Sequence, residues 1–261
     1  MKKLHWETIG NGSINLILLH GWGLNNNVWL FIIKKLSNHF KLYLVDLPGF
    51  GYSNALNDCS FNEISEILFQ SMPKKSIWLG WSMGGLFVNN IGLNHYKQVI
   101  ALINICSSPC FISKKNWPGI SDSKLMRMFN QLNKNYKKII YYFIEIQNQQ
   151  TKEEKLSIDF FKKIIFSKPI PEINTLKNGL KILKNIDLRE KMIKLKVPLL
   201  RIYGELDNLV PIEINNILNV KWPNTYSYII KKSGHAPFIS NPEVLCNILI
   251  KFKKKIKMNL Q

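Results

Sequence analysis

The segment Gly80-Trp81-Ser82-Met83-Gly84 separates two stretches of opposite character. Ser76 to Leu79 is a short apolar run typical of a buried strand, and Gly85 to Asn94 is typical of a helix. A chain that changes from strand to helix so abruptly needs glycines beside the serine, because a Cβ there would collide with neighbouring backbone. The pattern therefore predicts a tight turn that presents the Ser82 hydroxyl at the end of a buried strand.

The same alternation of apolar strands and helices continues over most of the chain. A length of 261 residues is sufficient for a well-buried core in one α/β domain. Continuous apolar strands between helices indicate a mostly parallel central sheet flanked by helices on both faces, with ligands at the carboxyl ends of the strands. The predicted strands are Ile14 to Leu19, Lys41 to Val45, Ser76 to Leu79, Val99 to Ile105, Leu199 to Tyr203 and Tyr226 to Ile230.

The alternation stops between residues 111 and 185, where the pattern is helical and strand signals are absent. We therefore expect a core formed by residues 1–110 and 186–261, with a helical cap of residues 111–185 inserted in it. The cap carries 15 Lys and Arg against 6 Asp and Glu, so nearly half of the chain's net charge of +19 belongs to it. A cap over Ser82 would form one wall of a substrate site and limit which substrates enter.

Two residues in other strand-end loops suit chemistry at Ser82. A serine hydroxyl is a weak nucleophile unless a base activates it and an acid orients that base. His235 lies in a loop shaped by glycine and proline after the last predicted strand, and it is the expected base. Asp207 follows the preceding strand and is the expected acid, with Glu205 in the same loop as the alternative.

An acyl-transfer site also needs two backbone N–H groups directed at one point, the oxyanion hole. The glycine-bracketed loop His20-Gly21-Trp22-Gly23 follows the first predicted strand, and the amide of Trp22 is one expected donor. The amide of Met83, at the start of the helix after Ser82, is the other. His20 is expected to shape its loop. The loop from Asp46 to Ser53 lacks the lysine of a phosphate-binding loop and is expected to be a structural turn.

The chain order Ser82, Asp207, His235 resembles that of the α/β-hydrolases, and it differs from the order in the serine proteases. The resemblance implies the α/β-hydrolase fold with an inserted cap. Each motif alone is a weak signal, but chance does not account for four motifs in this order and strand context.

A closer resemblance extends over essentially the whole chain. Ser107-Ser108-Pro109-Cys110-Phe111 and Trp117-Pro118-Gly119-Ile120, beside the cap, are similar to segments of the pimeloyl-acyl-carrier-protein methyl ester esterases, the BioH family. Leu18 to Asn25, Leu44 to Gly51 and His235 to Ser240 are also similar. The resemblance implies hydrolysis of the methyl ester of pimeloyl-acyl-carrier protein in biotin biosynthesis, with release of methanol.

The resemblance also implies roles for individual residues. Ser82, Asp207 and His235 would be the catalytic triad, and the substrate would contact Trp22, Ser82, Met83, Phe143, Ile144, Glu145, Ile146, Gln147 and His235. The acidic carrier protein would dock on Lys138 and Lys155. Tyr142 and Asp159 stand where the family has basic residues, so the carrier footprint is expected to be shifted or weaker. No metal or organic cofactor is implied.

Composition argues against other classes of function. All but three of the 36 basic residues are lysine, and no nucleic-acid-binding motif occurs, so specific nucleic-acid binding is not expected. The four cysteines lack metal-ligand spacing and are expected to be free thiols. The Ile14 to Leu19 run is too short for export or membrane spanning, which favours a cytoplasmic protein that does not bind membranes. A monomer is expected, although the sequence itself does not determine the oligomeric state. Two alternatives remain: a short-chain acyl esterase or lactonase of the same fold, and a non-catalytic ligand-binding protein.

Overall fold

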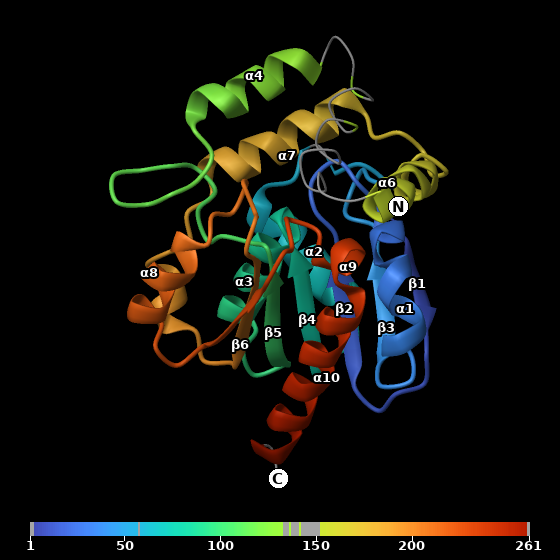
Figure 1. Ribbon diagram of the computed structural model, residues 1–261, viewed down its shortest axis with the longest axis vertical. Coiled ribbons are helices and arrows are strands. Elements are labelled where there is room, and N and C mark those ends of the chain that lie inside the picture. Colours follow the sequence, from blue (N-terminus) through green and yellow to red (C-terminus); the bar gives the residue numbers. More distant parts are fainter. Residues whose placement is uncertain (1–2, 57, 133–135, 137–140, 142–151, 260–261) are drawn as a thin grey trace.

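The computed structural model describes residues 3–56, 58–132, 136, 141 and 152–259, and of residues 152–158 and 259 it describes only the backbone. Strands and helices alternate along the chain (Figure 1). Their bounds in chain order are β1 (Trp6–Ile9), β2 (Asn15–Leu19), η1 (Asn26–Trp29), α1 (Leu30–Leu36), β3 (Lys41–Val45), α2 (Phe61–Ser71), β4 (Ser76–Trp81), α3 (Met83–Asn94), β5 (Val99–Ile105), α4 (Asp122–Leu132), α6 (Lys152–Ile165), α7 (Ile173–Asn185), η2 (Lys191–Lys194), β6 (Leu199–Gly204), α8 (Glu213–Lys221), β7 (Tyr226–Ile230), α9 (Pro237–Ser240) and α10 (Pro242–Asn259).

The described strands form one seven-stranded sheet in the order β1-β3-β2-β4-β5-β6-β7. β1 pairs antiparallel with β3, and every other pair is parallel. The predicted mostly parallel sheet is therefore confirmed. β1 was not predicted, because its residues are exposed or half-buried and lack the apolar pattern that identifies an inner strand.

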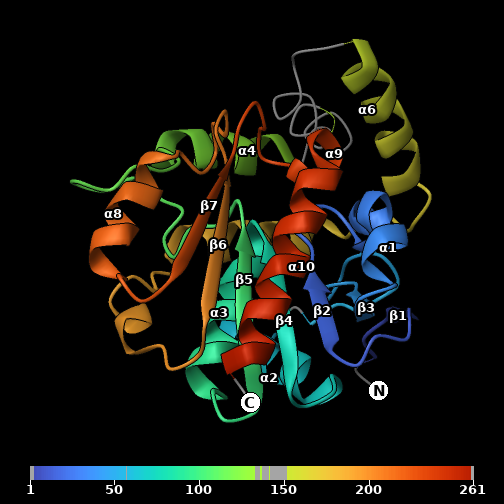
Figure 2. The same ribbon diagram turned by 60° about the horizontal axis from the view of Figure 1, so that its bottom comes forward.

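Helices cover both faces of the sheet, as continuous apolar strands require. α2 and α3 lie on one face, and α1, α9 and α10 lie on the other (Figure 2). β4 is buried along its whole length, and α3 packs on β4 and β5 with ten of its twelve residues buried. Such complete burial stabilises the element by about 1.5–3 kcal/mol for each large apolar side chain. The strand-to-helix turn at Ser82 therefore lies between two of the most firmly packed elements.

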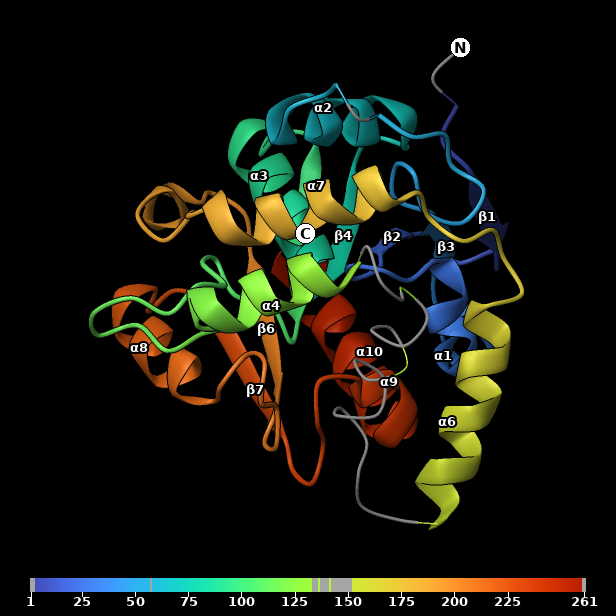
Figure 3. The same ribbon diagram turned by 90° about the horizontal axis from the view of Figure 1, so that it is seen from above.

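α4, α6 and α7 come from the insertion between β5 and β6, and α4 packs along α7. Seen from above, α4 and α7 cross the end of the sheet at which the parallel strands terminate (Figure 3). The exact bounds of the predicted cap, residues 111–185, stay a prediction. Among the described residues, no helix has both the length and the apolar character needed to cross a bilayer.

Candidate active site

Ser82 lies in the tight turn between β4 and α3, and its backbone has φ 54° and ψ −123°. A positive φ is strained for a residue with a side chain and persists only where the surroundings enforce it. The Ser82 amide donates to the Ile105 carbonyl at 3.0 Å, and the Ser107 hydroxyl donates to the Ser82 carbonyl at 2.7 Å. These bonds fix the turn from the neighbouring strand.

The glycines of the turn are needed for the reason predicted from the sequence. A Cβ on Gly80 would lie 2.5 Å from the Gly84 carbonyl carbon, and one on Gly84 would lie 2.7 Å from the His20 carbonyl oxygen. Both distances are too short for real contacts. The helix α3 begins at Met83, two residues earlier than expected, so it starts directly after Ser82.

The structure brings Asp207 and His235 together from the loops after β6 and β7. His235 Nδ1 lies 2.7 Å from Asp207 Oδ2, and both side chains are buried. The other carboxylate oxygen, Oδ1, accepts the amides of Leu209 at 2.8 Å and Val210 at 3.0 Å. An acceptor for three N–H donors suits an ionised carboxylate, which in turn holds the imidazole with its proton on Nδ1.

Trp81 connects the Ser82 turn to the histidine loop. Its indole Nε1 donates to the His235 carbonyl at 2.7 Å, and the two rings lie 5.5 Å apart. Glu205, the alternative acid, accepts the Lys232 amide at 2.8 Å on the exposed side of its loop. The geometry therefore favours Asp207 over Glu205 as the partner of His235.

Cys106 is a neighbour of this pair that the sequence did not indicate. Its thiol is buried, with Sγ 3.7 Å from the Gly234 carbonyl, and its ligand atom lies within 4.8 Å of those of Asp207 and His235. Burial, and then the charge of Asp207, raise the pKa of the Cys106 thiol well above its usual range. A metal binds the thiolate form of cysteine, and a raised pKa disfavours that form. Whether the site is free of metal stays a prediction.

The expected oxyanion loop lies against the Ser82 turn. A Cβ on Gly21 would lie 3.1 Å from Ser82 Cβ, which is tighter than most real contacts of a Cβ, so a larger residue would push the loop and the turn apart. Met83 is the first residue of α3, and the amides in the first turn of a helix have no intrahelical acceptor. The Met83 amide is therefore in the position expected of a donor to an oxyanion.

His20 stabilises the oxyanion loop through both ring nitrogens. Nδ1 lies 2.7 Å from the Gly21 carbonyl, and the Leu47 amide donates to Nε2 at 2.9 Å. The ring is therefore neutral, with its proton on Nδ1, because a protonated Nε2 would have to repel the Leu47 amide. Burial lowers the pKa of His20 to about 4. The expected loop-shaping role matches this geometry.

α7 contacts the oxyanion loop directly. The indole Nε1 of Trp22 donates to the Leu176 carbonyl at 2.9 Å. A Cβ on Gly179 would overlap Trp22 Cδ1, and it would lie 2.9 Å from Nε1 and 3.5 Å from Met83 Sδ. Gly179 is therefore a position at which α7 packs closely against the side chains of both expected oxyanion donors.

Two further bonds join the insertion to the same loop. The Tyr136 hydroxyl donates to the Gly23 carbonyl at 3.2 Å, and the Asn25 side-chain amide donates to the Ile165 carbonyl at 2.9 Å. Gly23 has a φ of 77°, which glycine adopts without strain. Segments more than 100 residues downstream therefore determine the shape of the oxyanion loop.

A family model described as "alpha/beta hydrolase fold" matches residues 14–242. The chain belongs to the α/β-hydrolase fold family. Among solved structures, an esterase from Exiguobacterium antarcticum is 22% identical with a TM-score of 0.86, covering 96% of this chain and 95% of that one. An enol-lactonase from Burkholderia xenovorans is 16% identical with a TM-score of 0.83, covering 96% of each chain. At such identities these likenesses show the shared fold.

This α/β-hydrolase also has a buried ionic contact that the sequence did not indicate. Lys168, between α6 and α7, is 8% exposed, and its Nζ lies 2.5 Å from Asn26 Oδ1, 3.1 Å from Glu7 Oε1 and 3.3 Å from Asp46 Oδ2. Asp46 is fully buried and also accepts the Asn26 amide at 2.8 Å. The contact attaches the segment before α7 to the end of β3.

Several expected site residues of this α/β-hydrolase lie outside the described residues. These are Phe143, Ile144, Glu145, Ile146 and Gln147 of the expected acyl site, together with Lys138 and Tyr142. Lys155 lies in α6, where only the backbone is described, and Asp159 on the same helix is exposed and lies 3.8 Å from Lys162. Their roles in substrate and carrier binding stay predictions.

Proposed function

We propose that this protein is a serine hydrolase of carboxylic esters, with Ser82, Asp207 and His235 as its catalytic triad. The observation that carries the proposal is the 2.7 Å contact between His235 Nδ1 and Asp207 Oδ2, in loops that lie beside a serine held at positive φ. Two proteins of similar structure, an esterase and an enol-lactonase, support the same reaction class.

The reaction would proceed by two acyl-transfer steps. His235 takes the Ser82 proton as the hydroxyl attacks the ester carbonyl, and the resulting imidazolium is stabilised by Asp207. The alcohol leaves with the proton from His235. Water then attacks the acyl-enzyme by the same route, which releases the acid and regenerates Ser82. Both acyl-transfer steps use only these three side chains, the oxyanion donors and a water molecule.

The amides of Trp22 and Met83 would bind the oxyanion. Donors preorganised at this point stabilise charge that develops only in the transition state, and loss of one donor lowers kcat by about 10²–10³-fold. The bracing of Trp22 by Leu176 and the position of Met83 at the start of α3 support this role.

For the substrate we propose the methyl ester of pimeloyl-acyl-carrier protein, with methanol as the product and biotin biosynthesis as the role. The similarity of the segments at Ser107 to Phe111 and Trp117 to Ile120 supports this choice. The first segment adjoins the site, since Ser107 donates to the Ser82 carbonyl, and the second contacts the first, since the Trp117 indole donates to the Cys110 carbonyl at 2.8 Å. The alternative is a general short-chain esterase or lactonase.

Three variants test the triad. Ser82→Ala and Asp207→Asn should lower kcat by about 10⁴-fold or more on a small ester. Glu205→Gln is the matched control, because it neutralises a carboxylate of the same loop that faces Lys232. If Ser82→Ala keeps most of its activity, or if Glu205→Gln costs as much as Asp207→Asn, the proposed triad is wrong. A stoichiometric burst without turnover would indicate a binding protein.

The substrate is tested separately by methanol release from methyl-pimeloyl carrier, compared with a panel of small free esters. The carrier-bound ester should have the highest kcat/KM, and Lys138→Glu and Lys155→Glu should lower that value without affecting the free esters. Lys254→Glu, on the exposed face of α10, is the control. Equal preference for free and carrier-bound esters would favour the general esterase.

A further inference from the structure

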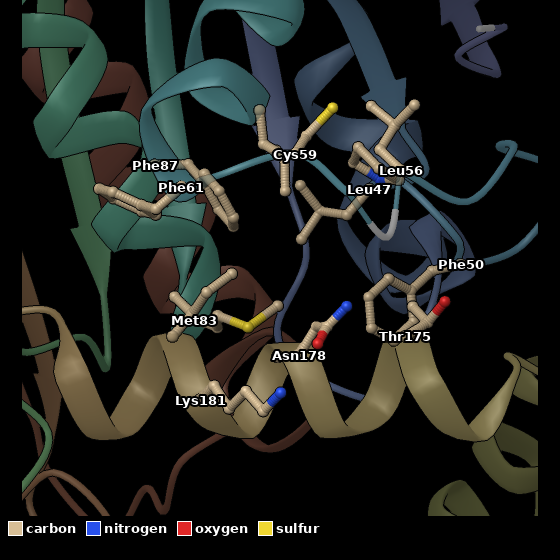
Figure 4. A pocket seen from close by; sticks show the side chains of 14 residues that line it. Leu47, Phe50, Leu56, Cys59, Phe61, Met83, Phe87, Thr175, Asn178 and Lys181 are labelled. Atoms are coloured by element: carbon tan, nitrogen blue, oxygen red, sulfur yellow. The ribbon is translucent and has the colours of Figure 1, made fainter.

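A cavity of about 200 Å³ lies between α7 and the core, next to Met83 (Figure 4). Its walls are mostly apolar and come from four places: the loop after β3 with Leu47 and Phe50, α2 with Phe61, α3 with Phe87, and α7. No role assigned so far uses this space. It lies beside the expected oxyanion donor without including the catalytic side chains.

The cavity is distinct from the space around the Ser82 hydroxyl. Among the described residues, Met83 lines it, whereas Ser82, Asp207 and His235 do not. Gly179, which lines the cavity, also packs against the side chains of Trp22 and Met83. A molecule in the cavity would therefore touch the Met83 side chain and none of the three catalytic side chains.

The polar residues at the cavity all come from α7. Of the 14 residues that line it, Lys181 is the one charged residue, and none is Asp or Glu. Lys181 is exposed, and within the described part of the chain it has no ion pair. In Figure 4 the Asn178 amide points from α7 towards the apolar side chains, and Lys181 lies one turn further along the helix.

We propose that this cavity binds an unbranched aliphatic chain that ends in a carboxylate. The apolar walls would take the chain, and Lys181 with Asn178 would take the anionic end. An apolar protein cavity of about 150 Å³ holds benzene, which has six CH groups, so a cavity of about 200 Å³ has room for roughly seven or eight groups of that size. Binding in this cavity does not depend on the proposed function. An effect of the bound molecule on catalysis, transmitted through Met83, would rest on the proposed function.

Calorimetry with a series of linear carboxylates tests the proposal. From butyrate to octanoate, each added methylene should lower Kd about fourfold, because a buried CH₂ contributes about 0.8 kcal/mol. The gain should end near octanoate, when the cavity is full. Ser82→Ala should bind octanoate as the natural protein does, so loss of esterase activity and loss of this binding are separate results. The absence of measurable octanoate binding, or a Kd independent of chain length, overturns the proposal.

Paired variants locate the binding. Lys181→Gln should weaken octanoate about two- to fivefold, as expected for an exposed ion pair, and should leave 1-octanol unchanged. Lys177→Gln, on the same helix but outside the cavity, is the control. Cys59→Phe, which extends a half-buried lining residue into the space, should abolish binding of both ligands, whereas Cys59→Ser should not. If Lys181→Gln and Lys177→Gln change the Kd equally, or if Cys59→Phe and Cys59→Ser do, the ligand binds outside this cavity and the proposal is wrong.

A last comparison identifies the source of the chain. In protein whose Ser82 carries a small phosphonate, continued octanoate binding indicates a separate aliphatic acid as the natural ligand. Loss of binding indicates that the cavity receives the chain of a substrate attached at Ser82.

Discussion

Replacement of Gly179 by alanine would test whether α7 determines the geometry of the oxyanion loop. The new Cβ would overlap Trp22 Cδ1 and lie 2.9 Å from Trp22 Nε1. Non-bonded atoms of this size prefer about 3.5–4.0 Å, so α7 or the indole must move by at least roughly 0.6 Å. The Trp22 indole cannot rotate away freely, because its Nε1 donates a hydrogen bond to the Leu176 carbonyl.

Two opposing terms decide the stability of this variant. Alanine is favoured over glycine inside a helix by about 1 kcal/mol. Overpacking in a well-packed site costs about 1–3 kcal/mol. The terms nearly cancel, so we expect the free energy of unfolding to change by no more than about 2 kcal/mol, which corresponds to a few degrees in Tm for a chain of this size.

The effect on catalysis should be much larger than the effect on stability. A misplacement of about 1 Å in a catalytic group can cost about 10²-fold in rate, and here the displaced residue supplies a proposed oxyanion amide. We expect Gly179→Ala to lower kcat/KM on a small ester about 10- to 100-fold. Lys177→Ala, at a half-buried position of α7 that faces Phe129 of α4, raises helix propensity without this overlap and should leave kcat/KM unchanged.

The measurements are steady-state kinetics and thermal unfolding on the same preparations. Trp22→Phe shortens the obstructing ring, so in a double-mutant cycle it should recover part of the activity lost in Gly179→Ala. If Gly179→Ala has kcat/KM within twofold of the natural protein, α7 does not hold the oxyanion loop in place and the reasoning is refuted.

Three further predictions follow from buried groups. Lys168→Met should lower the free energy of unfolding in urea by about 3 kcal/mol, because Asp46 is left buried without its cation, and Asp46→Asn added to it should recover part of the loss; an unchanged midpoint would contradict this. The pKa of His20 is lowered to about 4 in the folded protein, so the unfolded chain binds the proton more tightly. Stability should therefore fall by up to about 3 kcal/mol as pH drops from about 6.5 towards 4, and His20→Asn should flatten that slope. Cys106 should resist iodoacetamide at pH 8 in the folded protein, because burial raises its pKa, while half-buried Cys59 reacts; mass spectrometry of labelled peptides would detect the opposite order.

The inner strands and the candidate site residues could be predicted because each carries a local signal. The inner parallel strands are continuous apolar runs, and the loops that hold Ser82, Asp207 and His235 follow them directly. The carboxyl ends of parallel strands meet at one edge, so order along the chain already implied proximity. β1 had no such signal, since an exposed edge strand needs no apolar pattern.

Contacts of the insertion with the core could not be predicted, because they join residues far apart in sequence. Lys168 reaches Asp46 across 122 positions, and Trp22 reaches Leu176 across 154. In the sequence Lys168 is one of many lysines of the insertion, and Gly179 is one glycine in a helical run. Only the folded structure shows that Lys168 is buried against the Asp46 carboxylate and that Gly179 lies against the Trp22 indole.

These contacts divide the candidate site into two parts with different supports. Asp207 and His235 are positioned by the core, through the amides of Leu209 and Val210 and through the Trp81 indole. The oxyanion loop is instead held both by the core, through His20, and by the insertion, through α7 and the segments around it. Substitutions in α7 that displace Trp22, such as Gly179→Ala, should therefore lower kcat without shifting the pH at which activity rises, because the surroundings of the imidazole are unchanged. A shifted pH profile in Gly179→Ala would mean that the insertion also positions His235, and this division would be wrong.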